Sequence, residues 1–357
     1  MDGPRPRLLV VDPAAVDRDG GAAAIREAAA IIRRGGLVAF PTETVYGLGA
    51  DALDADAVRR IFAAKGRPSF NPVIAHVADA DAARALAAAW PDAAERLAQA
   101  FWPGPLTLVL PKRGHVPDAL TAGLPAVALR VPAHPVALAL VRAAGVPVAA
   151  PSANRYTELS PTTAAHVVRG LGAGTSGVPV DLVLDGGPTA VGIESTVVDL
   201  TGVARGDGPP RLLRPGTLDA ARLGAVLGTP VAAADAPRGD APRLAPGMVE
   251  RHYAPRAAVW AFDADARAPA AARLAAWRAG RPAGRAGALL LAPWGETLGG
   301  VPDAVEVLPA DPAGYARRLY AALHAMDEAE CEVVLVERPP DGPEWAGVRD
   351  RLMRAAR

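Results

Sequence analysis

The cationic pair Lys65 and Arg67 offers the clearest chemistry in this sequence. The two residues follow a predicted helix over 56–64 and lie in a short loop that contains a glycine and a proline. Lysine occurs only at positions 65 and 112, and all other basic side chains are arginines. An ammonium point charge beside a planar guanidinium suits adjacent phosphate oxygens. The alternative is a favourable interaction with the helix C-terminus, worth about 0.3–1 kcal/mol.

A second candidate site follows a predicted strand. Leu37 to Phe40 form a short apolar run after two glycines, which predicts a buried strand that ends at Pro41. Polar side chains come next, namely Thr42, Glu43, Thr44 and Tyr46. Ligands of open α/β sheets bind outside the carboxyl ends of strands, so this stretch is placed where small molecules bind. The alternative is a capped turn before the next helix.

Arg130 lies inside the apolar predicted strand 126–131. An isolated charge would be costly there, so the arginine must have an anionic partner. Glu43, Glu194 and a ligand carboxylate all remain candidates for that partner.

Neutral polar groups could complete a site. Ser152 and Asn154 follow the predicted strand 147–150, and Ser195 follows a glycine, an isoleucine and a glutamate. These side chains supply donors and acceptors for a polar substrate, although turn residues of the same kinds are common. His76, on the predicted strand 73–77, has no second His or Cys at metal-ligand spacing, so metal binding is not expected.

Strands and helices alternate along the whole chain, which predicts an α/β fold with a mixed sheet. Ser160 and Pro161 are expected to start a helix, with the serine as N-cap. The chain contains neither a Gly-x-Ser-x-Gly elbow nor a Walker phosphate loop, so a serine hydrolase and a P-loop ATPase are not supported.

A length of 357 residues favours two domains. We expect a catalytic domain over 1–227, a linker or lid segment over 228–257, and a smaller α/β domain over 258–357. The linker is rich in Ala, Pro, Gly, Asp and Arg, but its end, 245–255, carries enough specific side chains to dock somewhere. The last domain has no Gly-rich phosphate fingerprint, so no chemistry is assigned to it.

Composition limits the remaining classes. Thirty-eight basic and thirty-eight acidic side chains cancel to a net charge of +0, so no global field attracts nucleic acid or an anionic membrane. The single Cys331 cannot form an intramolecular disulfide. No apolar run is long enough to span a bilayer. The N-terminus lacks the succession of charged, apolar and small residues that is typical of a signal peptide. We therefore expect a cytoplasmic protein without membrane partners.

Several motifs together resemble the YrdC-like family of threonylcarbamoyl-AMP synthases. The segments that carry the resemblance are 40–49, 65–67, 102–107, 152–154, 194–196 and 213–216. The segments 246–248 and 252–255, followed by a second domain, are similar to the longer two-domain branch of that family. The resemblance implies a YrdC-like open twisted mixed sheet with helices, plus a smaller C-terminal Rossmann-like α/β domain.

The resemblance also implies a nucleotidyltransferase that condenses L-threonine, bicarbonate and ATP into threonylcarbamoyl-AMP and pyrophosphate. Its product would supply downstream threonylcarbamoyl transferase machinery for the modification of tRNA at position 37. Mg²⁺ is expected on the ATP triphosphate, and no protein-bound transition metal is expected.

By this likeness each candidate residue receives a role. Threonine would be held by Thr44, His76, Arg130, Ser195 and the backbone at Ala150. ATP would be surrounded by Lys65, Arg67, Asn71, Ser152, Asn154, Ser160, Arg214 and Tyr253. Lys65 and Arg67 would be the catalytic cations. Ala126 is a departure, because some relatives carry a hydroxyl residue there near the nucleotide.

Two alternatives compete with this interpretation. A double-stranded RNA or tRNA-binding module without catalysis could use the same basic residues, although the neutral total charge disfavours strong RNA affinity and leaves at most a weak tRNA contact. A carbamoyltransferase-like maturation protein shares the domain, but it should carry zinc-finger cysteines, and one cysteine is too few.

Overall fold

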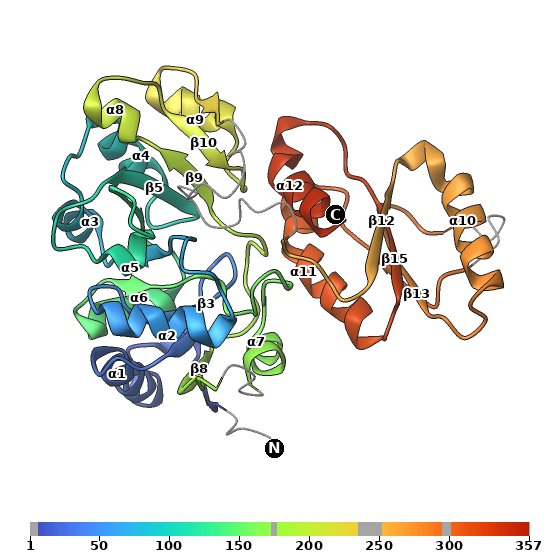
Figure 1. The fold of residues 1–357 in the computed structure, drawn as a ribbon, viewed down its shortest axis with the longest axis horizontal. Coiled ribbons are helices and arrows are strands. Elements are labelled where there is room, and N and C mark those ends of the chain that lie inside the picture. Colours follow the sequence, from blue (N-terminus) through green and yellow to red (C-terminus); the bar gives the residue numbers. More distant parts are fainter. Residues whose placement is uncertain (1–5, 173–176, 235–251, 295–300, 357) are drawn as a thin grey trace. The chain divides into compact units, whose positions relative to one another are not determined.

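A computed structural model describes residues 6–172, 177–234, 252–294 and 301–356. The chain divides into two compact units, Met1–Tyr156 with Ser160–Met248, and Thr157–Leu159 with Val249–Arg357. The first unit contains a large mixed sheet and the second a smaller parallel sheet, each with helices (Figure 1). The predicted α/β class, with a second and smaller α/β domain, is confirmed.

The sheet of the first unit has the strand order β1-β8-β2-β3-β7-β4-β6-β5-β9-β10-β11. Its strands are β1 (Arg7–Val10), β2 (Val38–Pro41), β3 (Tyr46–Asp51), β4 (Ile74–His76), β5 (Leu106–Pro111), β6 (Ala126–Arg130), β7 (Val148–Ala149), β8 (Leu182–Asp185), β9 (Thr196–Asp199), β10 (Arg211–Arg214) and β11 (Ala232–Ala233). Neighbouring strands pair in both directions, so the sheet is mixed, as predicted.

The helices of the first unit are α1 (Asp19–Arg33), α2 (Ala55–Lys65), α3 (Ala80–Leu86), α4 (Asp92–Phe101), α5 (Asp118–Thr121), α6 (Pro135–Ala144), α7 (Ala164–Leu171), α8 (Thr201–Arg205) and α9 (Ala220–Leu227). Helix α2 shows how local sequence sets these bounds. The Asp54 carboxylate accepts hydrogen bonds from two backbone N–H groups at its start, and Gly66 ends it with φ of 61°. Lys65 is therefore the last residue of α2, one residue beyond the end predicted at 64, so the predicted loop position of Lys65 was wrong and only Arg67 follows the helix.

The predicted polar loop after Pro41 was wrong in one respect. Only 42–45 form the turn, and Tyr46–Asp51 return as strand β3, antiparallel to β2. Gly47 lies opposite Phe40, and a Cβ at Gly49 would lie 2.7 Å from the Phe40 ring. These glycines leave room for the phenyl ring within the sheet, which is why a Gly-rich segment here is a strand and not a loop.

The predicted helix start at Ser160 was also wrong. Helix α7 begins at Ala164, and Thr163 caps it by accepting a hydrogen bond from the His166 N–H group. The hydroxyl of Ser160 instead donates to the carboxylate of Glu194. A tertiary partner thus replaced the local capping role that the sequence pattern favoured.

The two faces of the sheet differ around β4, β5, β6 and β9. Alternate residues such as Leu108 and Leu129 point into the main core, which also contains apolar side chains of α2, α3, α4 and α5. The opposite face carries a small apolar cluster formed by Ile74, Val109, Ala126, Ala128, Val197 and Leu213. Polar candidate residues lie on this second face, as described below.

The second unit is built on four parallel strands in the order β12-β15-β13-β14. Its elements are β12 (Ala258–Phe262), α10 (Arg267–Ala279), β13 (Ala286–Leu290), β14 (Ala304–Val307), α11 (Pro312–Glu328), β15 (Val333–Glu337) and α12 (Ala346–Ala355). Helix α10 packs on Ala286 and Ala288 of β13, whereas Met326 of α11 packs against Gly287. The sheet is therefore covered by helices on both faces (Figure 1).

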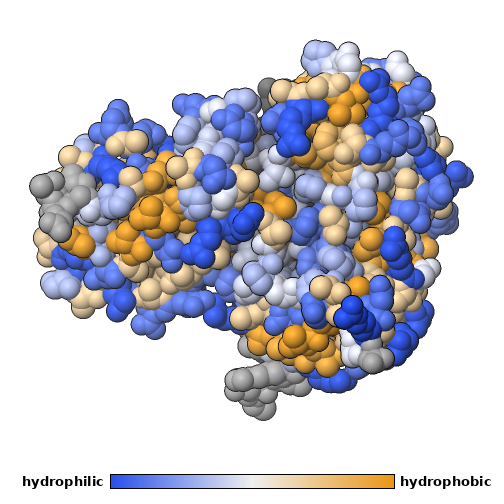
Figure 2. Space-filling model, turned by 180° about the vertical axis from the view of Figure 1, so that it is seen from behind, coloured by the Kyte–Doolittle hydropathy of each residue, from blue (hydrophilic) through white to orange (hydrophobic). Residues whose placement is uncertain are grey.

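Hydrophilic side chains cover most of the face shown in Figure 2, with apolar ones scattered among them. Among the described residues, no helix is long and apolar enough to cross a membrane.

Candidate active site

Strand register places polar side chains on the second face of the large sheet. His76 pairs with Arg130 across β4 and β6, and the antiparallel register of β5 and β6 continues to place Thr107 opposite Arg130. Thr107 in turn pairs with Val197 of β9. Cross-strand partners share a face, so His76, Arg130 and Thr107 form one row across three strands.

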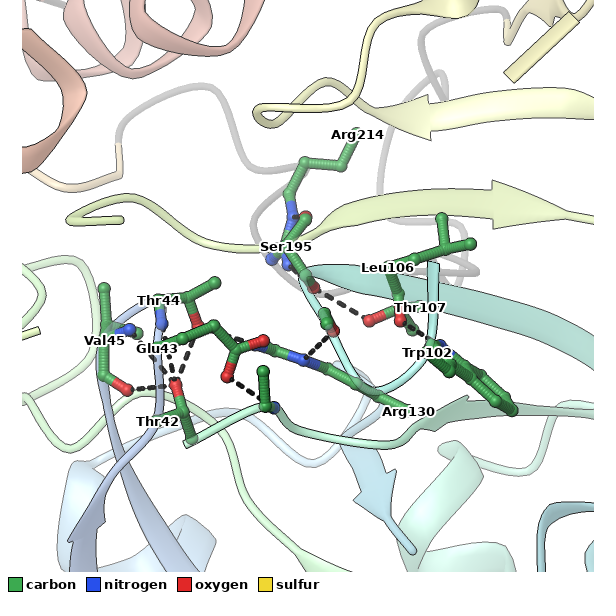
Figure 3. Close-up of polar contacts among 12 residues, drawn as sticks. Thr42, Glu43, Thr44, Val45, Trp102, Leu106, Thr107, Arg130, Ser195 and Arg214 are labelled. Atoms are coloured by element: carbon green, nitrogen blue, oxygen red, sulfur yellow. Dashed lines mark hydrogen bonds and ion pairs between the residues drawn. The ribbon is translucent and has the colours of Figure 1, made fainter. Parts of the chain in front are cut away.

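Arg130 is buried within a set of oxygen acceptors (Figure 3). Its Nη2 atom donates to the Glu43 carboxylate at 2.6 Å and to the Thr44 hydroxyl at 3.0 Å, and its Nε atom donates to the Gly104 carbonyl at 3.2 Å. Glu43 is therefore the anionic partner that the sequence required. Among the described residues, Nη1 donates to none, so two of the five N–H groups remain for a ligand.

Glu43 is itself held in place. Its second carboxylate oxygen accepts from the Ala133 N–H group at 3.1 Å, and its exposed fraction is 8%. Thr42 orders the same turn, because its hydroxyl lies 2.8 Å from the Thr44 hydroxyl and donates to the Val45 carbonyl. The turn after β2 thus presents the Glu43 carboxylate and the Thr44 hydroxyl to the guanidinium of Arg130, and Thr42 orders the turn.

The contact between Arg130 and Glu43 is not explained by the rule that sites form where the carboxyl ends of parallel strands meet. Strands β2 and β6 run antiparallel, with β3, β7 and β4 between them. Their carboxyl ends would lie at opposite edges of a flat sheet. The twist and curvature of this sheet nevertheless bring Arg130, the last residue of β6, to the turn that follows β2.

Ser195 joins the same region to β10. Its hydroxyl lies 2.8 Å from the hydroxyl of Thr107 and accepts from Nη2 of Arg214 at 3.1 Å. Nε of Arg214 also donates to the Ser195 carbonyl at 3.0 Å. Because Thr107 lies opposite Arg130 in the strand register, the Ser195 hydroxyl belongs to the same polar region as the Arg130 guanidinium (Figure 3). A carboxylate or phosphate at this place would meet two buried guanidinium groups.

Lys65 and Arg67 form a second polar cluster. The Lys65 ammonium donates to the carbonyls of Ser152 and Asn154, and the Lys65 carbonyl accepts from the Tyr156 N–H group at 2.8 Å. Nη2 of Arg67 donates to the Pro72 carbonyl at 3.1 Å. The structure therefore brings both cations to the segment after β7, where Ser152 and Asn154 also lie.

Tyr156 completes this cluster. Its hydroxyl accepts from the Asn71 side-chain amide at 3.1 Å, and the Arg67 guanidinium lies 6.0 Å from its ring centroid. Neither Tyr156 nor Thr107 is among the candidate residues predicted from the sequence. Tyr156 comes two residues after Asn154, whereas Thr107 sits in an apolar strand and gives no local signal beyond its hydroxyl.

The backbone connects the two clusters. The Ala153 N–H group donates to the Tyr46 carbonyl at 2.8 Å, and the Ala150 N–H group donates to the Ile74 carbonyl at 3.0 Å. The segment after β7 therefore runs between β3 and β4. Its hydrogen-bond partners Tyr46 and Ile74 lie two positions along the chain from Thr44 and from His76, respectively. Ser160, bonded to Glu194 next to Ser195, belongs to the same neighbourhood.

Tyr253 belongs to the second unit. It is buried there with φ of 60°, and its ring contacts the rings of His252 and Tyr320 and the guanidinium of Arg351. The predicted docking segment before it, including Pro246, Gly247 and Met248, lies outside the described residues.

His76 has a strongly lowered pKa. Burial, and then the positive charge of Arg130, lower the pKa of His76 to about 3. The imidazole is therefore neutral at physiological pH, and its buried Nδ1 atom has no hydrogen-bond partner among the described residues. A buried polar atom without a partner costs free energy, so this nitrogen is available to a ligand.

We predict that His76 lowers the free energy of unfolding in weak acid. The unfolded chain takes up a proton below about pH 6.5, whereas the folded chain resists protonation until about pH 3. The free energy of unfolding should therefore drop by about 2 kcal/mol more in the native protein than in His76→Gln between about pH 7.5 and pH 5. Urea denaturation followed by circular dichroism at both pH values measures this difference. Equal losses in the two proteins would contradict the prediction.

Two family profiles match this chain. A family profile described as "Telomere recombination", of the Sua5, YciO and YrdC proteins, matches residues 30–216. A second profile, described as the C-terminal domain of threonylcarbamoyl-AMP synthase, matches residues 218–357.

Two relatives match nearly the whole chain. The threonylcarbamoyl-AMP synthase of Pyrococcus abyssi is 43% identical over 93% of this chain and 94% of its own length. That of Bacillus subtilis is 40% identical over 93% and 92%. Among solved structures, P. abyssi Sua5 complexed with L-threonine superposes with a TM-score of 0.85, at 40% identity over 98% of this chain and 97% of that one.

Proposed function

The chain belongs to the two-domain family of threonylcarbamoyl-AMP synthases, and we propose that it condenses L-threonine, bicarbonate and ATP into threonylcarbamoyl-AMP and pyrophosphate. The observation that carries this proposal is the buried guanidinium of Arg130, whose Nη1 atom donates to none of the described residues. Strand register places Thr107 opposite Arg130, and the Thr107 hydroxyl lies 2.8 Å from the Ser195 hydroxyl, which accepts from Arg214. This arrangement suits an amino-acid carboxylate next to a phosphate.

In this proposal Arg130 binds the threonine carboxylate through Nη1. The hydroxyls of Thr44 and Ser195 lie within the same polar network and would contact the threonine backbone or side chain. His76 would offer its neutral Nδ1 atom, and the backbone at Ala150 would line the pocket. The apolar cluster that contains Ala126 and Ala128 lies on the same sheet face and would limit access of water.

ATP would be bound by the second cluster. Lys65 and Arg67 would neutralise the triphosphate, with Asn71, Ser152 and Asn154 beside them. Arg214 and Ser160 would contact the nucleotide from the Ser195 side, and Tyr253 would close over it. Mg²⁺ would arrive as part of the Mg-ATP substrate, where it offsets charge on the phosphates.

The reaction needs an unprotonated threonine amine. The amine attacks the carbon of bicarbonate or carbon dioxide to form a carbamate, and water leaves if bicarbonate reacts. A carbamate oxygen then attacks the α-phosphate and pyrophosphate departs. Cations fixed before the reaction can stabilise the charge that develops on the phosphates, so positioning and electrostatics supply most of the catalysis.

Mass spectrometry tests this proposal. The purified protein incubated with ATP, bicarbonate, threonine and Mg²⁺ is expected to form threonylcarbamoyl-AMP and an equal amount of pyrophosphate. Omission of any one substrate, or chelation of Mg²⁺ by EDTA, should abolish product formation. Threonine binding measured by calorimetry should survive EDTA, because Arg130 and not the metal holds the carboxylate. Product formed at full rate in EDTA would exclude a role for Mg²⁺.

The product would be passed to a threonylcarbamoyl transferase that modifies tRNA. Direct contact of this chain with tRNA is tested by a gel-shift series over salt concentration, because phosphate contacts weaken as salt rises. We also retain the division into a catalytic domain over 1–227, a lid segment over 228–257 and a C-terminal domain over 258–357 as a proposal.

A further inference from the structure

A pocket of about 660 Å³ opens at one edge of the parallel sheet in the second unit. It is lined by residues at or just after the carboxyl ends of β12, β13 and β15, and by one side of helix α12. Its volume lies within the range of small-molecule sites. No part of the active site described above lies in this pocket.

The position of the pocket in the sheet has a topological reason. Strands β12 and β15 are parallel neighbours, and the helices that follow them lie on opposite sides of the sheet. Helix α10 follows β12 and packs on one face, whereas α12 follows β15 and packs with α11 on the other (Figure 1). The chain therefore leaves a crevice between the two strand ends, which is the usual ligand position in open α/β sheets.

The lining contains two arginine–aspartate ion pairs. Nη1 of Arg338, directly after β15, lies 3.0 Å from a carboxylate oxygen of Asp263, directly after β12. Arg349 of α12 pairs with Asp341. The two carboxylates are 63% and 88% exposed, so both can change partner at little cost. Two arginines and two aspartates sum to zero, which suits a neutral zwitterion better than a polyanionic nucleotide.

The remaining lining is apolar. Leu291, Leu352 and Met353 contribute side chains to it, together with Pro339 and Pro340. Met353 is 57% exposed, so its side chain is accessible to an apolar group of a ligand.

The pocket has a rigid base. Glu337, the last residue of β15, is 2% exposed and accepts from Arg267 Nη2 at 2.6 Å and from the Leu291 N–H group at 2.8 Å. The Arg338 N–H group donates to the Phe262 carbonyl at 2.8 Å. These bonds fix the ends of β12, β13 and β15 relative to one another, so the pocket is preformed.

We propose that this pocket binds a small zwitterion of the amino-acid or dipeptide class with an apolar side chain. The carboxylate of the ligand faces Arg338 or Arg349, its ammonium faces Asp263 or Asp341, and its apolar part packs on Leu291, Leu352 and Met353. None of the residues assigned to threonine or ATP lines the pocket, so its occupation is a second binding function of the full-length chain.

Isothermal titration calorimetry of the full-length protein with L-leucyl-L-leucine tests the proposal. Saturable binding is expected, and N-acetyl-L-leucyl-L-leucine amide, which lacks both charges, should bind about tenfold more weakly or not at all. Arg338→Ala and Met353→Glu should each weaken dipeptide binding by about tenfold or more. Arg281→Ala is the matched control, because Arg281 is an exposed, ion-paired arginine outside the pocket.

Three results would overturn the proposal. They are the absence of saturable dipeptide binding, unchanged affinity in Arg338→Ala, and binding of AMP, but not of the dipeptide, that depends on Arg338. The last result would identify an anion site in place of a zwitterion site.

Discussion

Lys65→Met is expected to lower the rate of threonylcarbamoyl-AMP formation by about 10²- to 10³-fold, the usual cost of removing one fixed donor that stabilises developing charge. The substitution keeps much of the buried volume but removes the ammonium that binds the Ser152 and Asn154 carbonyls. Both the triphosphate and the segment after β7 would lose a positive contact. Steady-state release of pyrophosphate, with threonine and bicarbonate present, measures the effect.

Lys112→Met is the matched control. Lys112 is the other lysine of the chain, and it likewise donates to a backbone carbonyl, that of Val116, while pairing with Asp118. It lies after β5, outside both polar clusters, so its removal should leave turnover nearly unchanged. Thermal unfolding of both variants separates loss of catalysis from loss of fold. A folded Lys65→Met protein with native activity would remove Lys65 from the mechanism.

Arg130→Lys is expected to raise the KM for threonine by about 10- to 150-fold, which corresponds to the 1.5–3 kcal/mol of a hydrogen bond to a charged group. A lysine keeps the positive charge beside the buried Glu43 carboxylate, so the fold is preserved. It cannot keep the Glu43 and Thr44 contacts and also present two further donors to a carboxylate, because it lacks the planar fork. Initial rates at saturating ATP, together with threonine titration calorimetry, measure the change.

Arg211→Lys provides the comparison on a nearby strand, since Arg211 of β10 pairs with the buried Asp199 carboxylate at 2.6 Å outside the site. The KM for ATP should change little in Arg130→Lys. Equal increases in the KM values for threonine and ATP would point to distortion of the sheet, and an unchanged KM for threonine would contradict carboxylate binding by Arg130.

The sequence by itself predicted the α/β class, the mixed sheet and most of the strands and helices. Local signals were sufficient wherever the physical cause is local. The apolar run 37–40 predicted strand β2, and the pattern over 56–64 predicted helix α2, which ends one residue later at Lys65. An arginine inside an apolar strand required an anionic partner, because a buried charge is stable only when it is paired.

Only the tertiary structure decided which partner that is and how the groups meet. Glu43 pairs with Arg130, whereas Glu194 accepts from Ser160, and helix α7 begins at Ala164 with Thr163 as its cap. Gly47 and Gly49 belong to a strand because the Phe40 ring packs over them. Arg130 reaches the turn after β2 across an antiparallel arrangement, because the sheet curves. Each of these outcomes depends on contacts between residues far apart in the chain, and a local pattern carries no information about such contacts.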